Sequence, residues 1–169
     1  MGARKIEKVS ALVIGFGIVM LSMLPIHGWT QFGIYPGCSI YGRFLYPFFH
    51  AGLIHAGMNV WCFVSLVFIY DISKWRLLLA YLFSVSFPID TFSFLITSTN
   101  PTVGLSGMIF FLMGSISFEV SRRLYFQGWM VFYLSIGFLF PYVSAWIHLY
   151  GYCGGLILAL LNKPIRIRP

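Results

Sequence analysis

The sequence predicts an all-α polytopic membrane protein that forms one helical domain. Of its 169 residues, 59% are hydrophobic and only 9% are charged, whereas about a quarter of the residues of a soluble domain carry a charge. A soluble domain of this size also lacks the interior needed to bury so much apolar surface. Six spanning helices of about 20 residues would use about 120 residues and leave only loops and ends. We therefore expect a single six-helix membrane domain over residues 1–169.

The apolar runs locate the six expected transmembrane helices. The breaks between them are, in order, the connection 27–50 with its prolines and glycines, the turn 71–74, the polar stretch 97–102, the pair Arg122–Arg123 and the turn at Pro141. Glycine, proline and clustered polar residues typically interrupt helices in this way. The expected helices are 9–26, 52–70, 76–97, 106–121, 124–140 and 145–162.

The basic residues predict how these helices are oriented. Cytoplasmic loops of membrane proteins are enriched in lysine and arginine. With six helices, Arg43 alone falls on one side, and the other ten basic residues fall on the opposite side: Arg4, Lys5, Lys8, Lys74, Arg76, Arg122, Arg123, Lys163, Arg166 and Arg168. We therefore expect both termini in the cytoplasm. The charges are scattered between apolar runs and form no basic stripe, so the expected partner is the lipid bilayer and not nucleic acid.

Ser106 is the first candidate for chemistry. It lies in Gly104-Leu105-Ser106-Gly107, at the start of the fourth expected helix. From Ser106 to Arg122 a helix rises about 24 Å, less than the hydrocarbon thickness of about 30 Å, which places the hydroxyl below the outer surface. The first N–H groups of a helix have no intrahelical partners and can stabilise an oxyanion. Alternatively, the glycines around Ser106 serve only close helix packing.

His148 begins the sixth expected helix at a similar depth. A serine hydroxyl and an imidazole at one level are the pair needed to activate a nucleophile. Gly151 and Gly155 form a Gly-xxx-Gly face that allows a second helix to approach closely. The alternative for His148 is an interfacial histidine bonded to a loop carbonyl.

His50, His55 and Asn59 follow the pattern His-x4-His-x3-Asn. His55 and Asn59 are four residues apart, so they share one face of the second expected helix, and their N–H donors could point at one oxygen. Helix–helix hydrogen bonding or a metal site are the alternatives, although His and Asn at this spacing form a weak metal pattern.

No carboxylate is placed to complete a catalytic triad, so the residues favour a Ser–His dyad. Asp90 is the acid that lies well inside an expected span, two residues after Pro88. It either satisfies backbone groups freed by the proline or faces a polar cavity.

Together these residues resemble the rhomboid family of intramembrane serine proteases. The resemblance rests on three motifs in order, and it extends over roughly residues 40–160: His50-Ala-Gly-Leu-Ile-His55-Ala-Gly-Met-Asn59, Gly104-Leu105-Ser106-Gly107 and His148-Leu-Tyr-Gly151-Tyr-Cys-Gly-Gly155. Arg43 is similar to the arginine of the family's Trp-Arg pair in the first loop, but Gly42 stands where the tryptophan would be.

The resemblance implies a serine endopeptidase, with no metal or cofactor, that cleaves transmembrane segments of other membrane proteins at an active site facing the extracytoplasmic side of the cell membrane. Ser106 would be the nucleophile and His148 the general base. The remaining implied roles are an oxyanion hole formed by His55, Asn59 and the Ser106 N–H, a structural role for His50, packing through Gly151 and Gly155, and a lateral gate at 124–140.

Two other functions compete with proteolysis. A non-catalytic rhomboid-like protein that binds membrane clients would keep the fold without needing the dyad. A small transporter or channel would need polar residues along the whole membrane depth, whereas here they cluster in the outer halves of the helices.

Overall fold

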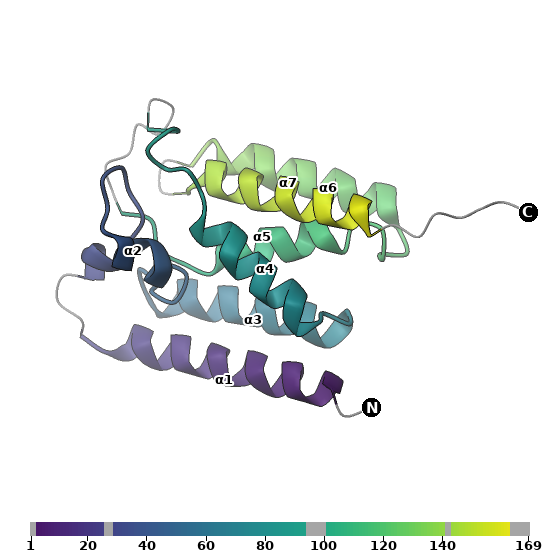
Figure 1. Cartoon of the computed structure of the whole chain (residues 1–169), viewed down its shortest axis with the longest axis horizontal. Helices are drawn as coiled ribbons and strands as arrows, with labels where there is room; N and C mark the ends of the chain where they lie inside the picture. Colours follow the sequence, from purple (N-terminus) through teal and green to yellow (C-terminus); the bar gives the residue numbers. More distant parts are fainter. Residues whose placement is uncertain (1–2, 26–28, 94–100, 141–142, 163–169) are drawn as a thin grey trace, which may run out of the picture.

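The structure is a computed structural model that describes residues 3–25, 29–93, 101–140 and 143–162, and this part of the chain is helical (Figure 1). Its α-helices are α1 (Ala3–Met23), α2 (Ile40–Leu45), α3 (Leu53–Ile69), α4 (Lys74–Val85), α5 (Ser106–Ser115), α6 (Arg123–Gly137) and α7 (Ala145–Leu161), with a 3-10 turn, η1 (Trp29–Phe32). An isolated antiparallel bridge joins Ile34 to Thr102.

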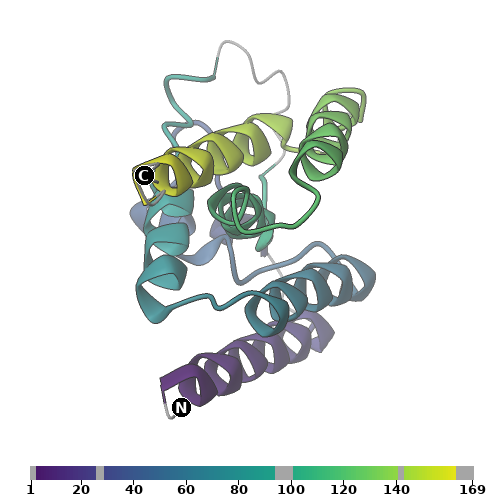
Figure 2. The ribbon, with the colours of Figure 1, turned by 90° about the vertical axis from the view of Figure 1, so that its right-hand side faces the viewer.

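Helix α5 lies at the centre of the molecule. Figure 2 shows it between α3, α4 and α7, with α1 outside α3 and α6 beside α7. Helix α5 carries apolar residues on all of its faces. Leu105, which precedes the helix, and Ile109 and Leu112 within it are almost completely buried. A helix that is apolar all round is stable only when other helices cover it. This explains why the short helix α5 occupies the core.

Helices α5 and α7 approach each other backbone to backbone. A Cβ atom added at Gly114 would overlap the Tyr152 carbonyl oxygen, and one added at Gly155 would overlap the Phe111 carbonyl oxygen. At Gly151 an added Cβ would lie 2.5 Å from the Gly107 carbonyl oxygen. Small residues allow this separation in helix pairs, so the glycines of α5 and α7 fix the distance between the two helices.

The observed helices differ from the expected ranges in several places, and the first helix, α1, begins at Ala3 and not at residue 9. The expected helix 76–97 stops at Val85, and residues 86–93 form turns, because Pro88 lacks the N–H that a continuing helix needs; residues 94–97 lie outside the described part. The expected helix 106–121 ends as α5 at Ser115 and continues as turns. The expected loop 27–50 contains η1 and α2.

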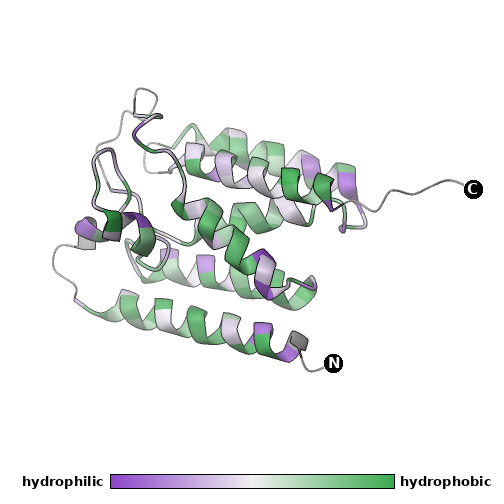
Figure 3. Cartoon of the chain, in the orientation of Figure 1, coloured by the Kyte–Doolittle hydropathy of each residue, from purple (hydrophilic) through white to green (hydrophobic). Residues whose placement is uncertain are grey.

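The surface of the bundle is hydrophobic. Exposed fractions reach 89% for Leu124, 81% for Ile54 and 75% for Trp61, and Figure 3 shows that hydrophobic residues predominate along α1 and α6. By length and composition, one described helix could cross a membrane, over Lys5–Met23, while Leu53–Ile69, Ser106–Ser115 and Ala145–Leu161 are apolar but shorter. The count of six spans therefore stays a prediction.

The two ends of the helical bundle differ in charge. Helix α1 begins and α7 ends at the same end of the molecule (Figure 1), where α4 and α6 also begin. The described basic residues near this end include Lys5, Lys74 and Arg123, while Arg43 lies in α2 at the opposite end. Lys163, Arg166 and Arg168 lie outside the described residues.

Candidate active site

The Ser106 and His148 side chains are within hydrogen-bond distance. Ser106 is the first residue of α5, and His148 lies in the first turn of α7. The His148 Nε2 atom is 2.8 Å from the Ser106 Oγ atom. The backbones of α5 and α7 are in contact at Gly107, the residue after Ser106, and at Gly151, about one turn after His148, so the glycine packing holds the two side chains at this distance.

The start of α5 leaves backbone donors next to the Ser106 hydroxyl. The preceding residue, Leu105, provides no side-chain cap, and the first N–H groups of a helix have no intrahelical acceptor. Gly104 turns the chain into the helix with a φ of +130°, a conformation that favours glycine. The helix N-terminus therefore presents partial positive charge where Ser106 lies.

His50 and His55 lie on the other side of this turn. The Leu105 N–H donates to His50 Nε2 over 3.2 Å, and the His50 and His55 rings meet edge to face with centroids 5.0 Å apart. A Cβ added at Gly104 would lie 3.0 Å from His55 Cε1. Gly104 thus needs both its backbone conformation and its lack of a side chain, because the His55 ring packs directly against it.

Asn59 is buried on the same helix as His55. Its Nδ2 atom donates to the His55 carbonyl oxygen over 2.9 Å, so one amide hydrogen is used within α3. An asparagine amide carries a second hydrogen. The contacts above bring five residues into one cluster: Ser106, His148, His50, His55 and Gly104. Asn59 contacts this cluster through its hydrogen bond to the His55 backbone.

A buried hydroxyl pair lies beneath the start of α5. Tyr46, which is 1% exposed, donates to the Ser84 carbonyl oxygen over 3.0 Å, and its hydroxyl is 2.5 Å from Ser84 Oγ. A Cβ at Gly107 would lie 2.6 Å from Ser84 Oγ. Gly107 therefore makes room for this pair as well as for α7. Tyr46 and Ser84 are far apart in the sequence, and no motif connects them.

The first loop holds the segment that leads into Ser106. The Ile34 N–H donates to the Thr102 carbonyl over 2.8 Å, the Thr102 N–H donates back over 3.0 Å, and the Gly104 N–H donates to the Tyr46 carbonyl over 2.8 Å. Thr102 also hydrogen-bonds through its hydroxyl to Ser144, just before α7. These bonds position the Ser106 backbone from outside the helix pair.

Arg43 and Asp90 form an ion pair that anchors the same loop. Arg43 also donates to the Phe87 carbonyl over 3.2 Å, and Asp90 accepts from the Gly37 N–H over 2.8 Å. The expectation that Asp90 lies within a helix is therefore wrong, because the helix ends before Pro88 and the carboxylate faces the loop. Gly42 is required by close packing, since a Cβ there would lie 2.8 Å from the Gly33 carbonyl oxygen.

Phe110 packs on the His148 ring, a contact that the sequence reasoning missed. The two rings are stacked, with centroids 4.4 Å apart and planes inclined by 14°. Phe110 is four residues after Ser106 and hence on the same face of α5, so helical periodicity could have indicated it. The stacking restricts the orientation of the imidazole next to Ser106.

His50, which precedes α3, is kept neutral by its surroundings. Burial, together with a smaller effect of the nearby His55, lowers the pKa of His50 from 6.5 to about 4. A neutral imidazole is what the Leu105 N–H requires as an acceptor. Among the described residues, no group of three or more His, Cys, Asp or Glu side chains could hold a metal ion.

Comparison with known protein families identifies the class of membrane protein to which this helical bundle belongs. Residues 37–164 match the Rhomboid domain family. The chain is therefore a member of the rhomboid family and an integral membrane protein. Searches of curated proteins and of solved structures give no significant match.

Proposed function

We propose that this rhomboid-family protein is a serine endopeptidase that cleaves transmembrane segments of other membrane proteins. The observation that supports it best is the 2.8 Å separation of His148 Nε2 and Ser106 Oγ across the α5–α7 contact. In this proposal His148 accepts the proton of the Ser106 hydroxyl as the oxygen attacks a peptide carbonyl. As the tetrahedral intermediate collapses, the peptide C–N bond breaks and the leaving amine takes the proton from His148, which leaves an acyl-enzyme on Ser106. His148 then removes a proton from water as the water attacks the acyl-enzyme, and Ser106 is released with its proton restored.

The oxyanion of the tetrahedral intermediate is stabilised in this proposal by donors around the start of α5. The Ser106 N–H is part of the helix N-terminus, the His55 ring lies against Gly104, and Asn59 has a second amide hydrogen. Losing one such donor typically lowers kcat by about 100-fold or more. His50 and Gly104 hold the turn in place, and Gly151 and Gly155 hold α7.

The substrate is a helix that must unwind locally before it is cleaved, because its carbonyls are hydrogen bonded within the helix in lipid. We therefore expect cleavage near residues that weaken a helix. The active site opens on the extracytoplasmic side in this proposal, opposite to the end of the molecule that carries most of the basic residues.

The test uses the purified full-length chain and a transmembrane substrate in detergent or proteoliposomes. Ser106→Ala is expected to abolish cleavage. Ser115→Ala is the matched control, because Ser115 is buried in the same helix and its hydroxyl donates to the Leu112 carbonyl. A fluorophosphonate is expected to label Ser106 in the wild type and to fail in His148→Ala.

Unchanged cleavage in Ser106→Ala would overturn the proposal. If neither protein cleaves and both bind membrane clients equally well, the non-catalytic client-binding function is the correct one.

A further inference from the structure

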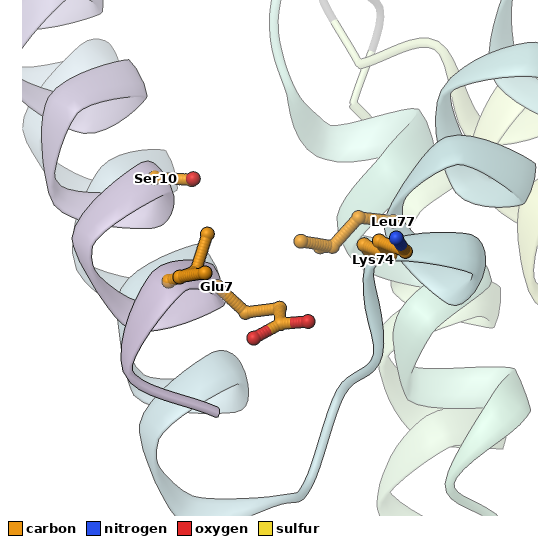
Figure 4. A pocket seen from close by; sticks show the side chains of 5 residues that line it. Glu7, Ser10, Lys74 and Leu77 are labelled. Atoms are coloured by element: carbon orange, nitrogen blue, oxygen red, sulfur yellow. The ribbon is translucent and has the colours of Figure 1, made fainter. Parts of the chain in front are cut away.

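A cavity of about 230 Å³ separates α1 from α4 at the end of the bundle opposite to Ser106. Ile6, Glu7 and Ser10 line it from α1, and Lys74 and Leu77 line it from α4. Figure 4 shows the Glu7 carboxylate extending from α1 toward Lys74 and Leu77. A water molecule occupies about 30 Å³ in the liquid, so the cavity has room for a group much larger than one water molecule.

One oxygen of the half-buried Glu7 carboxylate is not satisfied by the protein around it. Its Oε2 atom is buried and has no hydrogen-bond partner among the described residues. Leaving a charged acceptor buried and unpaired is costly. A donor from outside the protein would remove this cost, and a cation would also neutralise the carboxylate.

The other side of the cavity has the opposite charge and lies next to an exposed tryptophan. Lys74 is exposed at the start of α4, and its Nζ atom lies 5.8 Å from the centre of the Trp75 ring. Trp75 is 64% exposed, and exposed tryptophans typically lie at the level of lipid headgroups. The apolar Ile6 and Leu77 flank the charged pair. The cavity therefore combines an anionic acceptor, a cation and apolar walls at headgroup depth.

We propose that this cavity binds the headgroup of an ethanolamine phospholipid. The ammonium of the lipid donates to the Glu7 carboxylate, Lys74 faces the phosphate, and the first acyl carbons lie against Ile6 and Leu77. A zwitterionic headgroup matches both charges of the cavity, whereas an anionic lipid that lacks an ammonium group would leave Glu7 without a partner. A choline headgroup has the same charge but no N–H, so it cannot donate a hydrogen bond to Glu7.

The experiment measures lipid binding directly and does not depend on proteolysis. The delipidated full-length protein is titrated with dioleoyl phosphatidylethanolamine or dioleoyl phosphatidylcholine in detergent, and bound lipid is counted by native mass spectrometry. We expect the wild type to prefer the ethanolamine lipid by about tenfold, the usual effect of one charge-assisted hydrogen bond. In Glu7→Gln this preference should fall close to one.

Asp71→Asn is the matched control, because it removes one negative charge near the same end of the bundle without lining the cavity. It should keep the wild-type preference. Equal binding of the two lipids by the wild type would overturn the proposal, and that comparison needs no variant to fold. The proposal would also be overturned if Glu7→Gln lowered the thermal stability of the protein by the same amount in both lipids. That result would indicate that Glu7 pairs directly with Lys74 and not with a lipid headgroup.

Discussion

At the scale of single residues, the glycines between α5 and α7 determine whether Ser106 and His148 can meet. Gly155→Ala should lower the stability by about 2 kcal/mol, because the new methyl group overlaps the Phe111 carbonyl oxygen and forces the helices apart. Gly128→Ala, on α6, is the control, since nothing lies within 4 Å of an added Cβ there. Thermal unfolding in detergent measures the difference. Similar midpoints for both variants would show that the helices are not in close contact at Gly155.

His50 makes the stability of the protein depend on pH. The folded protein needs neutral His50 as the acceptor for the Leu105 N–H, and its pKa of about 4 is lower than the ordinary value of 6.5. Between these two values the unfolded chain binds a proton that the folded chain does not. The contribution is complete above pH 6.5 and is lost as the pH falls to 4, by about 3 kcal/mol. Unfolding midpoints from pH 7 to pH 4 should fall more steeply for the wild type than for His50→Gln. Parallel curves would contradict this role.

At the scale of elements, the first loop and the segment before α5 act as one unit. The Arg43–Asp90 ion pair fastens the loop that holds Thr102 and Gly104. Since the Asp90 side chain is 58% exposed, the coupling between the two charges should be modest, at about 0.5–1 kcal/mol in a double-mutant cycle of Arg43→Gln and Asp90→Asn.

The same two substitutions should also slow the labelling of Ser106 by a fluorophosphonate. Glu119→Gln is the control, because it breaks a different ion pair, with Arg76, away from the first loop. If Glu119→Gln slows labelling as much as Asp90→Asn does, the loop anchor has no specific effect on Ser106.

The sequence reasoning was most successful where a pattern is local. The starts of α5 and α7 follow from punctuation and apolar runs, and the observed helices begin within a residue of the expected ones. It failed where a contact links distant segments that carry no motif. Nothing near Asp90 indicates that its partner is Arg43, and nothing near Tyr46 indicates Ser84. The early end of α4 could have been anticipated, because Pro88 disfavours a continuing helix.

At the scale of the whole molecule, the two ends of the bundle have different chemistry. The Ser106 cluster lies at the end with η1 and α2, where α3, α5 and α7 begin, and the Glu7 cavity lies at the other end. Many large hydrophobic residues are exposed on the helices between these ends, and Figure 3 shows how hydrophobic residues are distributed along the helices. With this arrangement, the proposed active site and the proposed lipid site would face opposite sides of one membrane.

The charge difference between these ends predicts the orientation of the protein in the membrane. The start of α1 and the end of α7 should face the cytoplasm, since positively charged loops stay on that side of the membrane. A reporter fused after residue 169 should therefore report a cytoplasmic location, and one inserted between Pro36 and Gly37 should report the opposite side. Replacing Arg122 and Arg123 by Asn should weaken this preference, whereas replacing Arg43 should not. An outer location of the C-terminal reporter would mean that the described helices cross the membrane in the reverse direction.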